Sequence, residues 1–441
     1  MVKRLVMVSL LASLLGSLSM APSYAAGKQL DGHWEGAITQ PAGELKIMVD
    51  FMSEGDAVNG TFDLPAAAVF HWPLRTNYSA PKVKFRLPTG VAFDGELQGD
   101  TISGKVPSPT GGHVDAFYLR RKPLPPLPYK VEDVRFQSGG VTLAGTLRLP
   151  LSGGMHSALF LLQGSGGADR DAESFYADHF ARHGIATLVY DKRGVGDSTG
   201  NWETASFDDF AGDALAGVRY LQSRKEINPK RVGLYGRSHG AMVAPLAASR
   251  SNDVAFIVNV SGNGMPVTQN IIYGVEANMR AAGFSESDIN EAAAYMRQRF
   301  EVARTGQGWD TLKAKIDELQ SSQVKWLSIT GTPKDLDTLQ FFWKVQFSYD
   351  PIPHWQKAGQ PVLALYGGMD NSQPVTQIAT RIGKALTQGG NKKHTIRIFP
   401  NADHALLVWP KPNDSFHWPV LAAGYLDTMT NWIMKHAAVS K

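Results

Sequence analysis

The fold is decided by the stretch Val232-Gly233-Leu234-Tyr235-Gly236-Arg237-Ser238-His239-Gly240-Ala241-Met242. Its apolar beginning is typical of a buried strand, and its end is typical of a helix. Ser238 stands between the two at the apex of a turn, with a glycine two residues to either side. Such a turn strains the serine backbone, and a Cβ at Gly236 or Gly240 would collide with the neighbouring strand and helix. The pattern therefore predicts a nucleophilic serine on a strand–turn–helix junction.

Strand and helix patterns alternate on both sides of this junction, from about residue 131 onward. Val131–Phe136 and Val141–Leu149 predict a leading antiparallel pair. Ser206 and Asp209 predict an N-terminal cap for a helix whose apolar residues recur at helical spacing. Such alternation predicts a mostly parallel sheet with helices on both faces. Further strands are predicted at Ala158–Leu162, Ile185–Tyr190, Arg231–Tyr235, Ala255–Val260, Val362–Tyr366 and Thr395–Phe399.

The length and composition of the chain limit the alternatives. A chain of 441 residues predicts two domains, and 43% apolar with 19% charged residues is typical of a globular protein. The charged residues behind the formal net charge of +4 are interspersed, so we expect no nucleic-acid partner. The chain has no cysteine, which excludes disulfides, thiolate metal sites and a cysteine nucleophile.

Residues 1–25 have the pattern of a secretory signal peptide. Lys3 and Arg4 precede the apolar run 5–18, and Ser23-Tyr24-Ala25 is a small-x-small cleavage site. The apolar run is shorter than the ~20 residues that a membrane-spanning helix needs, which favours cleavage over an uncleaved anchor. We therefore expect a periplasmic or secreted protein without stable membrane insertion.

Residues 28–120 predict a separate, small all-β domain. Short segments of alternating polarity are separated by Gly, Asp and Asn, which favours an antiparallel barrel or sandwich. A Pro-rich linker at 121–130 separates this domain from a catalytic domain at 131–441. The β domain could shape the active-site entrance, mediate dimerisation or bind a carbohydrate or cell-wall component. Its residues Trp34, Trp72 and Tyr78 form either a core, which is favoured, or a platform for a stacked sugar.

The alternation is interrupted between residues 265 and 360. This segment is rich in helix-forming residues and in aromatic residues. A helical insertion at this point of such a fold is typically a lid over the active site. We expect a minority of its aromatic residues to face the substrate and most to form its own core. The tryptophans of the segment are Trp309, Trp326, Trp343 and Trp355.

A serine nucleophile needs a base to take its proton and an acid to orient that base. Asp370 follows the predicted strand Val362–Tyr366, at the end where open sheets place functional groups. His404 follows the next predicted strand, and the order serine, acid, histidine fits this kind of nucleophile. Ser238, Asp370 and His404 are therefore the predicted catalytic triad. Asp403 is too close to His404 in sequence for its carboxylate to reach the imidazole.

The oxyanion of a tetrahedral intermediate needs two backbone N–H donors. One is predicted to come from His239, the residue after the nucleophile. The other is predicted to come from the glycine-rich loop Gln163–Gly167, with Ser165 favoured and Gly166 as the alternative. Ser165 is rejected as the nucleophile because no strand–turn–helix apex surrounds it. We expect Gly166 and Arg237 to contact the substrate.

Two other patterns predict no cofactor. His179 and His183 have the i, i+4 spacing of metal ligands, but no third ligand accompanies them. The run Asp191–Ser198 has glycines spaced somewhat like those of a dinucleotide-binding loop, but no acidic residue completes that motif. A tight turn held by Asp191 and Arg193 is favoured. We therefore expect neither a metal nor an organic cofactor.

Four runs together resemble a bacterial family of serine esterases with the α/β-hydrolase fold and an N-terminal β domain. The resemblance covers roughly residues 131–441 and implies an α/β-hydrolase fold with a helical lid, and hydrolysis of carboxylic esters. That family is related to serine aminopeptidases and dipeptidyl peptidases. Arg237 and His239 depart from the residues usual at their positions, so substrate preference does not follow from the resemblance. The runs are Gly164–Asp171, Tyr190–Gly196, Gly236–Gly240 and Ala244–Ala247.

The sequence thus predicts an exported serine hydrolase that cleaves small-molecule esters through an acyl-enzyme intermediate. A peptidase or amidase for small peptides and a thioesterase remain alternatives. A peptidase would need an anchor for a peptide terminus, which Glu276 or Glu286 of the insertion could provide. An inactive binding protein is disfavoured because every catalytic position is filled. The oligomeric state stays open.

Overall fold

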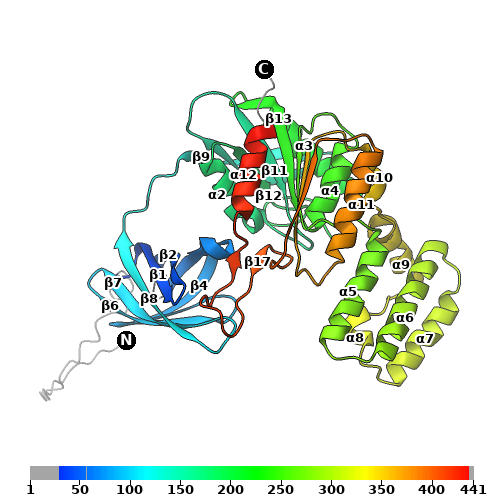
Figure 1. The fold of residues 1–441 in the computed structure, drawn as a ribbon, viewed down its shortest axis with the longest axis horizontal. Helices are drawn as coiled ribbons and strands as arrows, with labels where there is room; N and C mark the ends of the chain where they lie inside the picture. Colours follow the sequence, from blue (N-terminus) through cyan, green and yellow to red (C-terminus); the bar gives the residue numbers. More distant parts are fainter. Residues whose placement is uncertain (1–28, 56, 437–441) are drawn as a thin grey trace, which may run out of the picture.

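The computed structural model describes residues 29–55 and 57–436. Figure 1 shows an N-terminal barrel and a larger domain in which helices surround a sheet. The predicted signal peptide, residues 1–25, lies outside the described residues. Within the described ranges, no helix is long and apolar enough to cross a membrane.

The N-terminal part is a closed barrel of eight strands in sequence order, paired antiparallel. The barrel closes because the first strand pairs with both the second and the eighth. Buried and exposed side chains alternate along the strands, as the alternating sequence pattern predicted. The strands are β1 (Gly32–Gln40), β2 (Gly43–Glu54), β3 (Ala57–Leu64), β4 (Val69–Ser79), β5 (Lys82–Arg86), β6 (Ala92–Gln98), β7 (Thr101–Pro107) and β8 (Val114–Lys122), with a 3-10 turn η1 (Pro65–Ala67) before β4.

Aromatic rings fill the interior of the barrel. Phe85 stacks on Phe93 with ring centroids 4.6 Å apart, and Phe117 meets Phe93 edge to face at 5.0 Å. Trp34 is fully buried, and its indole N–H donates to the Leu30 carbonyl oxygen at 2.7 Å. A sugar-stacking platform that includes Trp34 is therefore wrong, because the ring belongs to the core.

Residues 123–128 form neither helix nor strand, and the chain then enters an eight-stranded sheet in the order β16-β15-β14-β13-β11-β12-β10-β9. The predicted leading pair β9 and β10 is antiparallel, β10 pairs antiparallel with β12, and the remaining neighbours are parallel. The strands are β9 (Tyr129–Ser138), β10 (Val141–Pro150), β11 (His156–Leu162), β12 (Ala186–Tyr190), β13 (Ile227–Arg237), β14 (Ile257–Val260), β15 (Val362–Gly367) and β16 (His394–Phe399).

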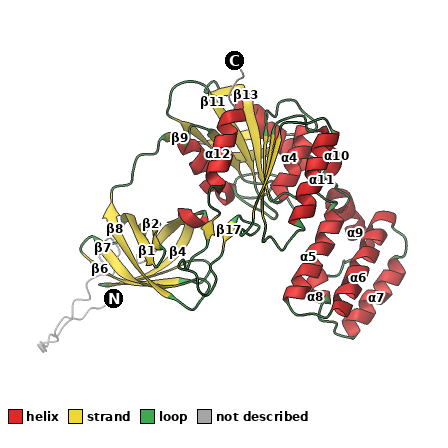
Figure 2. Ribbon diagram, viewed as in Figure 1, coloured by secondary structure: helices red, strands yellow, loops and turns green. Residues whose placement is uncertain are grey.

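Helices cover both faces of this sheet (Figure 2). One buried core joins the sheet to α3, α4, α10 and α11, and a second joins its other face to α2 and α12. The predicted cap is confirmed: the Ser206 side chain accepts from the Asp209 N–H, and the Asp209 carboxylate accepts from the Ser206 N–H. The elements are a 3-10 turn η2 (Arg170–Glu173), α2 (Ser174–Arg182), α3 (Phe207–Gln222), α4 (His239–Ala248), α10 (Ile352–Lys357), α11 (Val375–Gln388) and α12 (Tyr425–His436).

A helical insertion lies between β14 and β15 and forms a body of its own beside the sheet (Figure 1). Its separate core contains Trp326, with Trp309 and Trp343 packed against it. Trp355 was expected to belong to the insertion's own core or to face the substrate. It is instead fully buried on α10, in the core under the sheet. The elements are α5 (Val267–Ala281), α6 (Glu286–Thr305), α7 (Trp309–Ser321), α8 (Leu327–Thr330), α9 (Leu336–Phe342) and a π-helical turn η3 (Trp343–Phe347).

The chain beyond β16 connects the catalytic domain to the barrel. It forms a short antiparallel pair, β17 (Leu407–Val408) and β18 (Val420–Leu421), which lies between the barrel and the sheet in Figure 1. Trp418, in the loop between these strands, is buried in the core of the barrel. Ser108 of the barrel donates from Oγ to the His417 carbonyl oxygen at 2.6 Å. The two parts therefore share a core residue.

Candidate active site

Ser238 lies at the junction of β13 and α4, with φ 54° and ψ −112°. This left-handed backbone is strained for a residue that carries a side chain. A Cβ on Gly236 would lie 2.4 Å from the Gly240 carbonyl oxygen, and a Cβ on Gly240 would lie 2.3 Å from the Leu162 carbonyl oxygen. Close backbone approach therefore requires both glycines, for the reason that the sequence pattern indicated.

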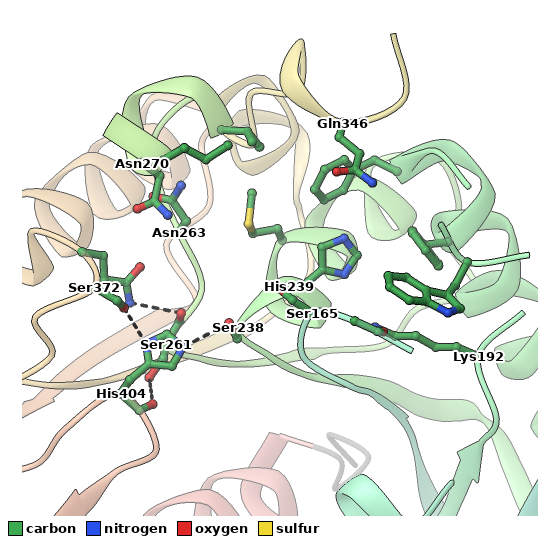
Figure 3. Close-up of a pocket in the computed structure, with 18 residues that line it drawn as sticks. Ser165, Lys192, Ser238, His239, Ser261, Asn263, Asn270, Gln346, Ser372 and His404 are labelled. Atoms are coloured by element: carbon green, nitrogen blue, oxygen red, sulfur yellow. Dashed lines mark hydrogen bonds between the residues drawn. The ribbon is translucent and has the colours of Figure 1, made fainter. Parts of the chain in front are cut away.

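Ser238, His404 and Asp370 form a continuous hydrogen-bonded array. His404 Nε2 lies 3.0 Å from Ser238 Oγ, and Figure 3 shows the imidazole turned toward the serine. His404 Nδ1 lies 2.6 Å from Asp370 Oδ2. Asp370 follows β15 and His404 follows β16, so the carboxyl ends of two adjacent parallel strands bring these side chains together.

The Asp370 carboxylate is buried and held on both oxygens. Ser372 donates to Oδ1 from its backbone N–H at 2.9 Å and from Oγ at 2.6 Å, and Gln373 Nε2 donates to Oδ2 at 2.8 Å. Burial by itself raises the pKa of Asp370, but the hydrogen bond and charge of His404 and the hydrogen bonds of Ser372 outweigh it. The pKa therefore lies below its ordinary value, and Asp370 is ionised at neutral pH. The sequence did not indicate Ser372 and Gln373, because their role depends on the turn after β15.

Asp403 stabilises the loop that carries His404. Its carboxylate accepts hydrogen bonds from the backbone N–H groups of Ala405 at 2.8 Å and Leu407 at 2.9 Å. It also accepts a hydrogen bond from the Trp409 indole at 2.6 Å. Asp403 thus orients the backbone on either side of a short turn, and Asp370 is the carboxylate that contacts the imidazole.

The glycine-rich loop after β11 passes beside Ser238. A Cβ on Gly164 would lie 3.8 Å from the Ser238 Cβ. Ser165, Gly166 and His239 line the same cavity as Ser238, and Figure 3 shows Ser165 and His239 next to it. The structure thus brings together the residues whose N–H groups were predicted to hold an oxyanion.

Lys192 is a site residue that sequence reasoning missed, although it belongs to the run Tyr190–Gly196. Its side chain is buried, and its ammonium donates to the carbonyl oxygens of Gly164 and of Gly166, the latter at 2.9 Å. Its backbone N–H donates to the Ala168 carbonyl oxygen at 3.1 Å. Burial lowers the pKa of Lys192 to about 8. The signal in the sequence was a lysine placed almost directly after a fully buried strand.

The run Asp191–Ser198 is a tight turn, as favoured. Asp191 accepts a hydrogen bond from Arg170 Nη2 at 2.6 Å, and Arg193 pairs with Asp213 at 2.6 Å. These pairs fasten the turn to η2 on one side and to α3 on the other.

The His239 imidazole forms part of the cavity wall. Its ring centroid lies 4.9 Å from that of Phe207 and 5.1 Å from that of Phe210. Burial, and after it the charge of Lys192, lowers the pKa of His239 to about 3. The ring is therefore neutral near pH 7 and offers the cavity a polar group without a charge.

A cavity of about 650 Å³ opens beside Ser238, a volume suited to a small organic molecule. Its wall combines residues of the catalytic domain with residues of the insertion (Figure 3). Among the residues that the structure describes, no Asp or Glu lines it. The lining residues are Ser165, Gly166, Lys192, Trp202, Phe207, Phe210, Ser238, His239, Met242, Ser261, Asn263, Val267, Asn270, Ile271, Gln346, Ser372, Gln373 and His404.

Arg237 does not line this cavity, contrary to the expectation that it contacts the substrate beside Ser238. Its Nε and Nη2 lie 2.9 Å and 2.8 Å from Oε1 of the fully buried Glu173. The charge of Glu173 raises the pKa of Arg237 above its ordinary value. The strand end directs this side chain toward a second cavity of about 660 Å³, between the barrel segment 67–73 and the beginning of α2. Gly166, the other residue expected to contact substrate, does line the first cavity.

Within the described part of the chain, no group of three or more His, Cys, Asp or Glu side chains is placed to hold a metal ion. His179 instead lies 2.8 Å from the Thr430 hydroxyl, and His183 Nδ1 lies 2.7 Å from the His179 carbonyl oxygen. Both imidazoles thus take part in hydrogen bonds of α2 and its surroundings.

The mostly parallel sheet, the strained serine at the carboxyl end of its internal strand β13, and the aligned histidine and aspartate define a hydrolase of the α/β-hydrolase type. Residues 125–399 match the model of the X-Pro dipeptidyl-peptidase (S15) family, which is more than half of the chain. The chain belongs to this family.

The chain is also similar to proteins of more distant relationship. It is 29% identical over 139 residues to the quorum-quenching protein AidA of Acinetobacter baumannii, a match that covers 31% of this chain and 46% of AidA. The chain thus spans less than half the length of that relative. It is 23% identical over 318 residues to an uncharacterised 31.7 kDa protein of Escherichia coli, covering 70% of this chain and 99% of the other. The structure of the Pyrococcus furiosus esterase Pf2001 is 18% identical, with a TM-score of 0.43, over 63% of this chain and 85% of that one.

Proposed function

We propose that this hydrolase cleaves carboxylic esters of small molecules through a covalent acyl-enzyme on Ser238. The observation that carries the proposal is the array in which His404 lies 3.0 Å from Ser238 Oγ and 2.6 Å from Asp370. These distances are within the range that a nucleophile and its base require. The array ends in a cavity of about 650 Å³ that is open to a small substrate.

In the proposed reaction, Ser238 Oγ attacks the ester carbonyl carbon while His404 Nε2 takes the hydroxyl proton. The tetrahedral intermediate then expels the alcohol, to which His404 returns that proton. Water attacks the acyl-enzyme with His404 again as the base, and the carboxylic acid leaves. Asp370, ionised and held by its own hydrogen bonds, keeps Nδ1 protonated and stabilises the imidazolium in both steps.

The backbone N–H groups of Ser165 and His239 are the proposed donors to the oxyanion. Both residues line the cavity beside Ser238. An N–H group aimed at the developing negative charge contributes roughly 3 kcal/mol of transition-state stabilisation. Because both donors belong to the backbone, side-chain replacement at His239 leaves its N–H in place.

Ester hydrolysis is favoured over removal of dipeptides from a peptide, although the family includes dipeptidyl peptidases. A free amino terminus is a cation and needs a carboxylate when it is taken out of water. Glu276 lies 3.8 Å from Arg297 and Glu286 lies 3.1 Å from Arg280, and neither lines the cavity. Within the described residues, the cavity is lined by the cationic Lys192 and by no carboxylate. This lining supports a neutral substrate.

The insertion is proposed to act as a lid that sets substrate specificity. Its residues Val267, Asn270, Ile271 and Gln346 complete the cavity wall opposite Ser238. Export to the periplasm or the medium is proposed from the pattern of residues 1–25 alone.

The test uses the full chain and its Ser238→Ala variant. A fluorophosphonate should label the wild type and not the variant, and 4-nitrophenyl esters should be turned over faster than aminoacyl 4-nitroanilides. Labelling that persists in Ser238→Ala would contradict the assignment of the nucleophile. Faster turnover of the anilides would identify a peptidase instead.

A further inference from the structure

Lys192 contacts the glycine-rich loop at two points and the residue that follows it at a third. Its ammonium donates to the carbonyl oxygens of Gly164 and Gly166, and its backbone N–H donates to the carbonyl oxygen of Ala168. The Lys192 side chain is only 3% exposed, so it is not a surface group that samples many positions. The Phe210 ring lies under the ammonium, with 5.7 Å from Nζ to the ring centroid. The Lys192 ammonium is therefore a cation held in a fixed position against the loop.

The geometry of a peptide bond converts these contacts into a direction for an N–H group. In a trans peptide the C=O and N–H of one plane point in opposite directions. The Gly164 carbonyl shares its plane with the Ser165 N–H. Because the carbonyl points to the Lys192 ammonium, the Ser165 N–H points away from it. Figure 3 shows Ser165 between Lys192 on one side and Ser238 on the other.

The loop would not hold this direction by itself. Glycine has little conformational preference, and Gly166 has φ +84°, so the peptide planes of this loop can rotate at low energetic cost. Gly167 packs closely against Trp202, since a Cβ at Gly167 would lie 2.5 Å from Trp202 Nε1. The described hydrogen bonds to the Gly164 and Gly166 carbonyl oxygens come from Lys192.

We propose that Lys192 is a positioning residue that holds the Gly164 peptide plane and thereby aims the Ser165 N–H at the oxyanion of the intermediate. This inference rests on the proposed acyl transfer at Ser238. In this role Lys192 acts through the loop, because two of its N–H groups donate to the Gly164 and Gly166 carbonyl oxygens. It also favours Ser165 over Gly166 as the second donor.

The ionisation of Lys192 gives the proposal a property that can be measured. Burial lowers the pKa of Lys192 to about 8, so the ammonium loses its charge just above neutral pH. Glu173 opposes this loss of charge, whereas Arg237 promotes it. The His239 ring also faces the ammonium but is neutral in this pH range. The hold on the two carbonyls should therefore weaken above pH 8, and kcat should fall with it.

The experiment compares Lys192→Met, Lys192→Arg and the control Lys313→Met in the full chain. Lys313 is an exposed lysine of the insertion that pairs with Asp317, so its loss removes one positive charge without touching the site. Two inhibitors are used with each protein. A trifluoromethyl ketone adds to Ser238 and forms an oxyanion, whereas the matched methyl ketone binds largely as the unreacted ketone.

We expect Lys192→Met to lower kcat for 4-nitrophenyl acetate about 100-fold with KM within about twofold. The inhibition constant of the trifluoromethyl ketone should rise by a similar factor, while that of the methyl ketone stays unchanged. Lys192→Arg should retain most of the activity but lose the fall in kcat above pH 8, because a guanidinium does not titrate there. Lys313→Met should behave as the wild type.

Each of the following results would overturn the inference. If Lys192→Met weakened both ketones equally, or if its activity loss followed a lowered melting temperature, Lys192 would have a general structural role. If the alkaline fall in kcat persisted in Lys192→Arg, another group would control it. A wild type that the fluorophosphonate does not label would overturn the proposed acyl transfer itself, and the inference with it.

Discussion

The indole N–H of Trp418 donates a 3.2 Å hydrogen bond to the carboxylate of Asp115, inside the N-terminal barrel. The other oxygen of Asp115 lies 2.7 Å from Nδ1 of His417. Trp418 belongs to the chain segment that leaves the active site after His404 and returns to the catalytic domain at α12. The segment that follows the His404 loop is therefore anchored in the core of the other domain. The barrel is part of the framework of the active site and is not an independent attachment.

Replacement of Trp418 tests this coupling. Trp418→Ala should lower the free energy of unfolding by about 3–5 kcal/mol, because a large buried ring is lost. It should also slow fluorophosphonate labelling of Ser238, because the His404 loop loses its anchor. Trp418→Phe keeps an aromatic ring but loses the bond to Asp115 and some buried volume, so it should cost less, about 1–2 kcal/mol. Urea unfolding and labelling rates measure the two effects, and labelling at the wild-type rate in Trp418→Ala would show that the anchor does not matter for the site.

Replacement of Asp370 should lower kcat far more than replacement of Asp403. Asp370→Asn should lower kcat by about 10³–10⁴-fold with little change in KM, because the imidazolium loses its charged partner. Asp403→Asn is the matched control, since Asp403 bonds the same loop but not the imidazole. It should lower kcat by about tenfold or less. Steady-state kinetics on one ester distinguishes the two, and equal losses would contradict the assigned partner.

His239 should make the protein less stable in acid. Its pKa of about 3 in the folded protein lies below the ordinary value of 6.5. Between these two pH values, His239 is therefore protonated in the unfolded chain and neutral in the folded chain. The free energy of unfolding therefore falls as the pH drops from 6.5 toward 3, by at most about 1.4 kcal/mol per pH unit. Between pH 6.5 and 4.5, the free energy of unfolding of His239→Gln should therefore fall by about 1–2 kcal/mol less than that of the wild type. Urea unfolding at these two pH values measures it, and an unchanged pH dependence in the variant would refute the prediction.

Substitutions of Glu173 and Arg237 should have non-additive effects on the free energy of unfolding. Glu173→Gln leaves the guanidinium without its charged partner and should lower the free energy of unfolding by about 3–5 kcal/mol, as should Arg237→Met. The double variant should be more stable than the sum of the two losses predicts, because neither charge is left unpaired. A double-mutant cycle measures this difference. Additive losses would mean that the two side chains do not interact.

The hydrogen-bonded array of Ser238, His404 and Asp370 could be predicted from the sequence, because each member follows a recognisable strand and the fold fixes their order along the chain. Ser238 needed only its own neighbours, and Asp370 and His404 needed only the strands before them. Lys192 and Trp418 could not be found this way, since their partners lie in other segments and nothing local marks the contact. The sequence pattern around Ser238 also could not predict where the Arg237 side chain points, because that depends on its ion pair with Glu173, which lies in a distant part of the sequence.

The insertion begins after β14 and ends before β15, and these two strands are direct neighbours that pair Ile257 with Val362. The sheet register therefore does not depend on what the chain does in between. Closing a longer or shorter loop between fixed ends changes the free energy only slowly with length. With a separate core of its own, the insertion is an exchangeable cassette. Grafting a different helical body in place of Val267–Phe347, so that α10 stays in the core under the sheet, should alter which molecules are accepted while the reacting groups keep their positions.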